Sequence, residues 1–257
     1  MKEQTLLIVE WVNALFGPPV ASLLGSLVSI VGPIAPRLGL HAPSGEEVIP
    51  THVVMATFVL LFCFAFFGYL RSRLSVENPG KLQQVVEVAV EFLGNQMEEI
   101  VGHDGRRFLA LVGTLGIFIL FSNLLGLIPG MASPTGNINV PAGCAITVFL
   151  YYHYHGMRKQ GFLRYLKHFA GPVWWLSPLM IPIETISHLA RPFSLTVRLF
   201  ANIFAEDLLI VVFFGLVPFL LPLPFMAFAI FGGLLQAFIF VTLTMVYLGG
   251  AVATEEH

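Results

Sequence analysis

The sequence predicts an all-α polytopic membrane protein, built as a single membrane domain over residues 1–257. Composition is the first reason, because 56% of the residues are hydrophobic and only 11% are charged, whereas a soluble domain carries about 25% charged residues. The second reason is that apolar segments long enough to cross a bilayer recur along the chain. We expect about five to six membrane helices, including two long terminal helices that form a hairpin, plus one amphipathic surface helix. Residues 1–52 should form an interfacial or periplasmic segment ahead of a helical core at 53–257.

The N-terminal segment gives the least regular pattern. Its apolar stretch at 6–35 is interrupted by glycines and prolines, foremost at Gly17, Pro18 and Pro19. Proline breaks or kinks a helix, so two short interfacial or re-entrant pieces and a true span are equally open here. Residues 36–51 are polar and predict a loop. Early acidic residues without a small-residue cleavage site predict no removable signal peptide.

Five apolar segments predict helices that cross the membrane. They lie at about 53–70, 108–128, 140–154, 179–217 and 224–252. The last two are longer than the roughly 20 residues that span a bilayer. Residues 81–101 instead alternate apolar side chains with four glutamates, which is typical of an amphipathic helix. This helix either lies on the membrane surface or packs on the aqueous side of the protein.

The distribution of basic residues predicts the orientation. If the loop after the first span is cytoplasmic, nine of the thirteen Lys and Arg residues lie inside: Arg71, Arg73, Lys81, Arg106, Arg107, Arg158, Lys159, Arg164 and Lys167. Lys2 and Arg37 then lie outside. The positive-inside rule favours this arrangement, which puts the C-terminus in the cytoplasm. The lack of a presequence favours a bacterial inner membrane, although an organelle-encoded chain would lack one as well. Trp174 and Trp175 suit an interfacial aromatic belt.

Polar side chains recur inside the fourth apolar segment. They are Glu184, His188, Arg191, Arg198, Asn202, Glu206 and Asp207. At 100° per residue the first six fall within about 80° of one another, with Arg198 at one edge. Asp207 falls about 180° from Arg198. The sequence therefore predicts one polar stripe along this helix, with a further acid behind it.

Structural explanations compete for most members of this stripe. Arg191 lies near a helix end, so a snorkelling side chain at the interface and a functional one are equally open. Glu184 and His188 have a structural alternative too, which is simple proximity to a loop. Asn202 is open as a helix–helix contact. Arg198 is harder to explain in this way, because a charge at mid-bilayer costs about 2.5 kcal/mol even on the lowest scale. An ion pair with Glu206 or Asp207 is its structural alternative.

The residue types in the stripe suggest proton handling. A guanidinium stays protonated under essentially all conditions, so it cannot relay a proton by releasing one. Carboxylates and histidine titrate closer to neutral pH when burial and neighbouring groups change their pKa values. Such groups on either side of a fixed positive charge suggest two polar half-paths separated by a barrier.

The run SLTVRLFANIFAEDLL at 194–209 resembles subunit a of the F-type ATP synthase. The resemblance extends from about residue 53 to the end, and its R-L-F-x-N run followed by Q-A-F-I-F is highly specific. Other matching runs are NPGKLQQVVE at 78–87, SNLLGLIPG at 122–130, PTGNINV at 134–140, PIETISHLARPFSL at 182–195, LLQAFIFVTLTMVYL at 234–248 and the terminal EEH.

The resemblance implies roles for individual residues. Arg198 matches the family's stator arginine, which meets the rotor carboxylate, drives its deprotonation and stops protons from passing directly between half-channels. Asn202 matches a polar residue on the entry side, and Asp207 an acid that lines the half-channel open to the outside. Gln236 matches a glutamine near the arginine.

The same resemblance implies the two ends of the path. Glu184 matches an acid of the cytoplasmic half-channel and Arg191 a basic residue near it, and His188 is expected to take part in proton release there. Some members have a small residue at the position of Glu206 and an ionisable one at that of Ala229, so Glu206 is expected to have taken over the relay. The outer entrance is expected to be lined by Asn123, Asn137 and Asn139.

The function implied is that of a proton-conducting stator whose ion-translocating core is 53–257. The partners implied are the c-subunit rotor ring, the peripheral-stalk subunit b and the rest of the complex, within membrane lipid. No cofactor, metal or ATP chemistry is expected on the chain, which has no phosphate-binding P-loop. A net charge of −2 gives no support for nucleic-acid binding. Cys63 and Cys144 are expected to be reduced packing residues.

Two other classes of protein compete with this interpretation. An ion-coupled secondary transporter would predict internal repeats with two broken helices in equivalent places, and no such repeat is visible in the sequence. An intramembrane enzyme would use histidines as metal ligands: His153, His155, His168 and His188. His153 and His155 are two residues apart and point about 160° apart on a helix, which makes a poor chelating pair.

Overall fold

The computed structural model describes residues 7–31, 48–102, 105–128, 130–161, 165, 177–216 and 222–252. Within these ranges the chain is helical and contains no strand. Its α-helices are α1 (Leu7–Val31), α2 (Thr51–Ser72), α3 (Lys81–Val101), α4 (Leu109–Leu125), α5 (Asn139–Gln160), α7 (Ser177–Leu216) and α8 (Pro222–Val252). Short 3-10 helices, η2 (Gly105–Phe108) and η3 (Pro134–Gly136), precede α4 and α5. The predicted all-α class is confirmed.

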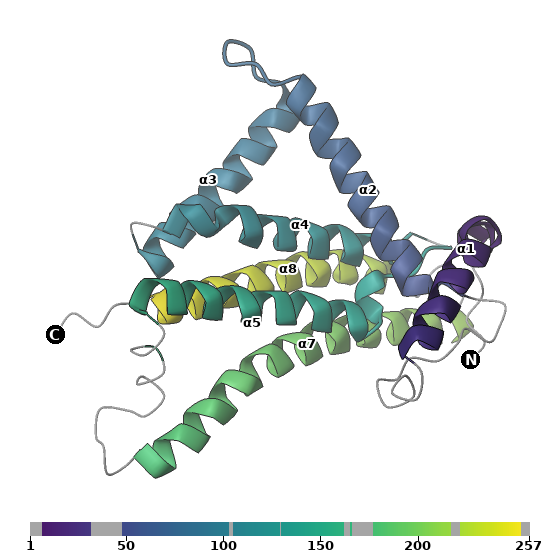
Figure 1. The fold of residues 1–257 in the computed structure, drawn as a ribbon. Coiled ribbons are helices and arrows are strands. Elements are labelled where there is room, and N and C mark those ends of the chain that lie inside the picture. The colour runs from purple at the N-terminus through teal and green to yellow at the C-terminus, as the bar shows by residue number, and fades with distance from the viewer. Residues whose placement is uncertain are drawn as a thin grey trace.

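Four helical segments in the described ranges are long and apolar enough to cross a membrane. They are α2, the continuous stretch Gly105–Leu125, α7 and α8. The remaining predicted span, α5, is helical as expected but runs on past Tyr154. Its last turns carry His155, Arg158 and Lys159, which lowers its mean apolarity. It nevertheless packs against both α7 and α8 (Figure 1), so it belongs to the same bundle.

The N-terminal apolar stretch forms one helix instead of two pieces. Pro18 and Pro19 lie inside the continuous α1, so the alternative of a break at these residues is wrong. Asn13 attaches this helix to the chain ahead of α2, because its side-chain nitrogen donates to the Ile49 carbonyl at 3.0 Å and its oxygen accepts from the Ile49 amide at 2.7 Å. The shorter apolar helix Leu7–Leu23 is not among the candidate spans.

The core of the bundle lies between α4, α5, α7 and α8, and α8 is packed by all three others (Figure 1). Phe108, Tyr152, Leu199, Phe240 and Leu248 are fully buried within it. The outward faces remain apolar, as Phe193 and Val211 of α7 illustrate. Apolar side chains that face outward along such helices fit a lipid environment. Cys63 and Cys144 are both free thiols, and Cys144 is buried in the core.

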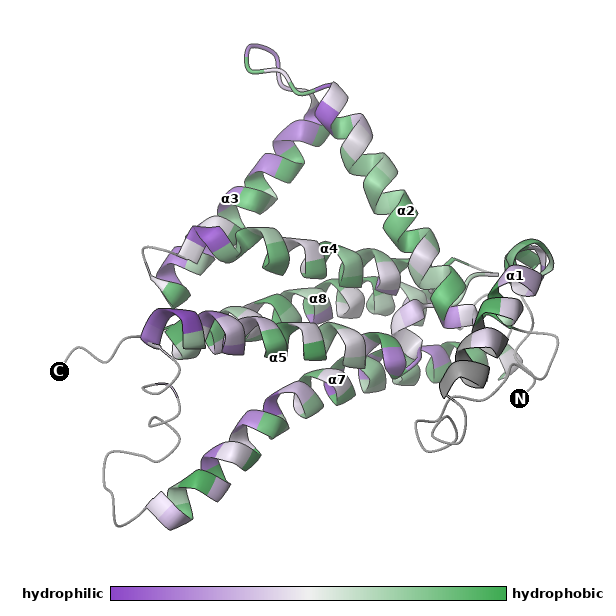
Figure 2. Cartoon of the chain, in the orientation of Figure 1, coloured by the Kyte–Doolittle hydropathy of each residue, from purple (hydrophilic) through white to green (hydrophobic). Residues whose placement is uncertain are grey.

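The longest helix, α7, departs from the bundle at its N-terminal end. Figure 1 shows this end bending away from α5, while the rest of the helix runs beside α5 and α8. Pro182 and Pro192 lie within it, and proline is the usual cause of a kink because it removes one backbone hydrogen bond. Hydrophilic positions interrupt the apolar surface along much of its length (Figure 2).

The amphipathic segment forms helix α3, as expected. α2 and α3 meet at one end and diverge toward the bundle (Figure 1). The distal part of α3 packs on α8, where the rings of Phe92 and Phe238 lie 6.1 Å apart, and Glu98 pairs with Arg106 at 2.6 Å. Its first turns keep Leu82 exposed. Helix α3 thus packs on the bundle through its distal part.

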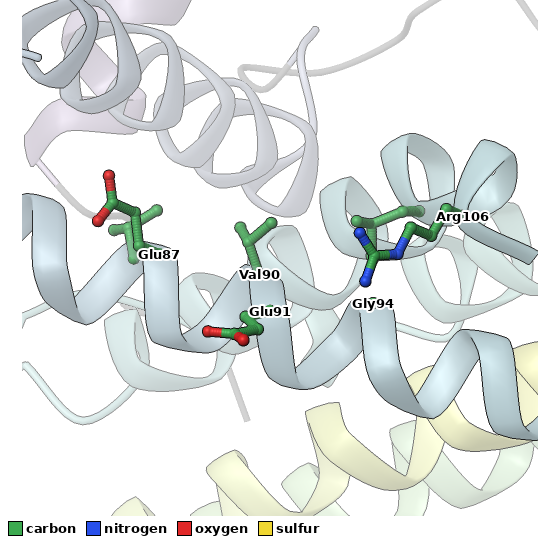
Figure 3. Close-up of a pocket in the computed structure, with 7 residues that line it drawn as sticks. Glu87, Val90, Glu91, Gly94 and Arg106 are labelled. Atoms are coloured by element: carbon green, nitrogen blue, oxygen red, sulfur yellow. The ribbon is translucent and has the colours of Figure 1, made fainter. Parts of the chain in front are cut away.

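A groove runs between α3 and the start of α4. Figure 3 shows Glu87 and Glu91 one turn apart on α3, with Arg106 beyond Gly94. This groove lies apart from the polar residues of α7. The basic residues Arg37, Arg164 and Lys167, the pair Trp174 and Trp175, most of the 36–51 loop and the C-terminal tail lie outside the described residues.

Candidate functional site

Arg198 lies on the outward face of α7. Its neighbours Leu195 and Leu199 are buried against the bundle, whereas Arg198 itself is exposed. The ion pairs formed within the described ranges do not include it. Glu206, one of its two candidate partners, accepts a hydrogen bond from Asn202 instead. A fixed positive charge on the outer surface of an apolar bundle is available to a group outside this chain.

A first cluster of polar side chains surrounds the second half of α7. We call it the Glu206 group, and it consists of Asn123, Ser133, Thr135, Asn202, Glu206 and Asp207. Asn202 and Glu206 are one helical turn apart, and the Asn202 side-chain nitrogen donates to Glu206 Oε1 at 2.9 Å. Both are half-buried, and they face Gly232 of α8. Asp207 points elsewhere, toward η3, where a Cβ on Gly136 would lie 3.5 Å from Asp207 Oδ2.

The rest of the Glu206 group is a buried chain of hydrogen bonds. Ser133 Oγ donates to the Ser122 carbonyl at 3.0 Å and lies 2.7 Å from Thr135 Oγ1. Thr135 Oγ1 donates to Asn123 Oδ1 at 2.7 Å, and Asn123 Nδ2 donates to the Gly233 carbonyl at 3.2 Å. The chain therefore connects the end of α4, the turn before α5 and the middle of α8. Buried polar groups need such partners.

A second cluster surrounds the first half of α7. We call it the His188 group, and it consists of Tyr152, His153, Glu184, His188, Arg191 and Tyr247. His188 is buried between two partners, Glu184 Oε1 at 3.3 Å from Nε2 and the Tyr152 hydroxyl at 3.3 Å from Nδ1. The His153 ring packs edge-on to it with centroids 5.2 Å apart. The Arg191 guanidinium lies 5.4 Å from the centroid of the Tyr247 ring.

Three further residues predicted to line the proton path, Gln236, Asn137 and Asn139, lie outside the two groups. Gln236 is buried in α8, one turn beyond the glycine that faces Glu206. Asn137 Oδ1 accepts from the Asn139 backbone amide at 3.1 Å, so this pair orders the start of α5. Asn137 is half-buried and Asn139 exposed. They follow η3, the element that faces Asp207.

Several residues of both groups are not predicted as site residues from the sequence. Ser133 precedes the PTGNINV run and Thr135 lies within it, where the asparagines are the more conspicuous polar residues. The sequence gives no signal for Tyr152, and it indicates His153 only as a candidate metal ligand. The adjacent Gly232 and Gly233 were the available signal for a close helix approach inside a long apolar segment.

The geometry of the histidines bears on the metal-enzyme alternative. In the described part of the chain no three His, Cys, Asp or Glu side chains converge as a metal site would require. His155 packs on Phe108 with ring centroids 5.0 Å apart, away from the His153 contact with His188. His168 lies outside the described residues.

Sequence comparison identifies the family. The model of the family described as "ATP synthase A chain" matches residues 52–249. The chain belongs to this family. An ATP synthase subunit a of Koribacter versatilis is 45% identical over 87% of this chain and 93% of its own length. One of Solibacter usitatus is 50% identical over 79% and 87%, and subunit a 1 of Syntrophotalea carbinolica is 48% identical over 80% and 87%.

Membership of the ATP synthase A chain family agrees with the apolar helices. The matched range begins within the first turn of α2 and ends near the end of α8, so it covers all four candidate spans except the first residue of α2 and the last three of α8. The chain is an integral membrane protein of this family. The resemblance inferred from its motifs is confirmed.

Proposed function

We propose that this chain is the stator subunit a of a rotary F-type ATP synthase and conducts protons to and from the carboxylates of a c-subunit ring. The observation that supports this most is the position of Arg198, exposed on α7 between the Glu206 and His188 groups. A membrane-embedded arginine is costly unless it meets protein or water. A ring of carboxylates passing along α7 would supply its partner.

The two groups would serve as two separate half-paths. Arg198 is eight residues from Glu206 and ten from His188, which on a helix rising 1.5 Å per residue is about 12 and 15 Å. Glu206 and His188 are therefore about 27 Å apart along α7, far beyond the roughly 3 Å of a direct hydrogen bond. The positive charge between them also repels a migrating proton. Protons would then cross by way of the rotor and not along α7.

The direction of each step follows from the chemistry of the groups. A proton enters through the Glu206 group, where the carboxylates of Glu206 and Asp207 can accept it, and neutralises a rotor carboxylate. The neutral site can enter lipid, which an ionised carboxylate could scarcely do. After nearly a full turn it releases the proton toward Glu184 and His188, and Arg198 holds the ionised carboxylate between the two. The membrane potential supplies about 2.3 kcal/mol per charge per 100 mV.

The setting of the subunit is part of the proposal. We propose a bacterial inner membrane as the location. We infer that the C-terminus lies in the cytoplasm, because most basic residues then lie inside. The Glu206 group faces the outside and the His188 group the cytoplasm. The peripheral-stalk subunit b holds the chain against the turning ring. ATP chemistry takes place on other subunits of the complex.

The test compares two arginine variants in inverted membrane vesicles that carry the whole complex. Arg198→Ala should abolish ATP-driven proton pumping with the complex still assembled, and passive proton leak should rise, as followed with a pH-sensitive dye. Arg71→Ala, an exposed arginine at the end of α2, should pump normally. Undiminished pumping by Arg198→Ala would mean that the arginine is structural and that the mechanism is wrong.

A further inference from the structure

The face of α8 that meets Glu206 has no side chain at the point of contact. A Cβ placed on Gly232 would overlap Glu206 Oε1, and it would lie 3.3 Å from the carboxylate carbon and 3.9 Å from Asn202 Nδ2. The overlap with Oε1 leaves no room for a methyl group while the carboxylate keeps this position, whereas the distance to Asn202 is an ordinary contact. The space that receives the Glu206 carboxylate is therefore made by the missing side chain of Gly232.

The next glycine of α8 serves a different neighbour. A Cβ on Gly233 would lie 3.1 Å from Asn123 Cβ on α4, and the Gly233 carbonyl accepts from Asn123 Nδ2. Successive residues of a helix point about 100° apart. Gly232 therefore faces α7 and Gly233 faces α4, so the two glycines separate the placement of Glu206 from that of the buried hydrogen-bond chain.

We propose that Gly232 is a positioning residue for proton uptake, which holds the Glu206 carboxylate against α8 in the conformation that accepts the Asn202 hydrogen bond. The proposal rests on the proposed role of Glu206 in the proton path. A side chain at residue 232 would occupy the carboxylate's place and force Glu206 into another rotamer, with loss of the Asn202 bond. The atom that would have to move is the far end of a flexible side chain, so the helices themselves can stay in place.

This geometry predicts an effect on conduction that is larger than the effect on assembly. In inverted vesicles with the whole complex, Gly232→Ala should lower ATP-driven pumping several-fold, the size expected for the loss of one hydrogen bond. Gly250→Ala is the matched control on the same helix, because a Cβ there meets nothing within 4 Å. It should leave pumping unchanged.

A second substitution separates positioning from a general packing defect. Aspartate is one methylene shorter than glutamate, so Glu206→Asp withdraws the carboxylate from the space that a methyl group at residue 232 would fill. The double variant Gly232→Ala/Glu206→Asp should pump better than Gly232→Ala alone, although Glu206→Asp by itself pumps less than wild type. Such a non-additive pair is the signature of direct contact.

Three outcomes would overturn the proposal. They are wild-type pumping by Gly232→Ala, additive effects in the double variant, and an assembly defect of Gly232→Ala that Glu206→Asp does not relieve. Pumping that is lost in Glu206→Gln but normal in Gly232→Ala would reject the role of Gly232 alone. Normal pumping in both Glu206→Gln and Arg198→Ala would instead reject the proposed function.

Discussion

The two polar groups on α7 consist of different types of residue. The Glu206 group uses carboxylates, amides and hydroxyls, and two glycines of α8 allow the helices to approach it closely. The His188 group is enclosed by rings, since Tyr152 and His153 of α5 and Tyr247 of α8 surround it. The glycines let the acidic side chain of Glu206 lie directly against α8, whereas the aromatic residues contribute a hydroxyl and an imidazole group of their own to the contact with His188. One helix thus carries two polar sites with different packing.

The largest expected effect concerns the carboxylate at the centre of the first group. Glu206→Gln keeps the side chain's length and an oxygen that can accept from Asn202, but removes proton binding. If Glu206 relays protons, ATP-driven pumping should fall about a hundredfold, as for loss of an acid–base group, while the complex assembles. Glu206→Ala should conduct as poorly. Glu91→Gln, an exposed glutamate of α3, is the control, and equal pumping by the Gln variants at 206 and 91 would remove Glu206 from the path.

A smaller effect is expected in the ring-lined group. Tyr152→Phe keeps the buried ring and removes the hydroxyl that contacts His188 Nδ1. One net hydrogen bond is worth about 0.5–1.5 kcal/mol, so pumping should fall about two- to tenfold, because His188 is less firmly oriented. Tyr154→Phe, on an exposed face of α5, should pump like wild type. Identical rates for the two variants would show that the hydroxyl of Tyr152 does not orient the relay.

A change in the buried hydrogen-bond chain should have the smallest effect on conduction. Its main effect should be on stability. Thr135→Val leaves Asn123 Oδ1 without its donor, which should destabilise the fold by about 1–3 kcal/mol. Thermal unfolding of the detergent-solubilised complex measures this loss. Thr147→Val is the control, because Thr147 is exposed and bonds only within its own helix. A large loss of pumping without destabilisation would place Thr135 in the proton path itself.

The course of the helices was largely predictable from sequence. The first span was expected at 53–70 and α2 is Thr51–Ser72, and the last was expected at 224–252 and α8 is Pro222–Val252. Long apolar runs bounded by charges or prolines determine such limits locally. The exception is α1, where proline predicted a possible break and the helix continues. Its pairing with Ile49 through Asn13 is a contact between distant residues, which the pattern around the prolines does not reveal.

The polar stripe was predictable for the same local reason. Asp207 was expected to lie off the stripe, behind Arg198, and it contacts a different element from Glu206: Glu206 meets Gly232 of α8, whereas Asp207 meets Gly136 of η3. The spacing of 100° per residue depends on one helix alone. The interpretation of these residues as a proton path remains a prediction.

By itself, then, the sequence determined the membrane-spanning class, the family and which residues of α7 share a face, because helical periodicity and hydropathy act over neighbouring residues. Only the tertiary structure decided what lies opposite each of them. Tyr152 meets His188 across 36 residues of chain, and Asn123 meets Gly233 across 110. Such partners are selected by how helices cross, and the crossing depends on side-chain volumes along several helices at once. For that reason a glycine with no chemistry of its own became visible as a neighbour of Glu206 only in the folded molecule.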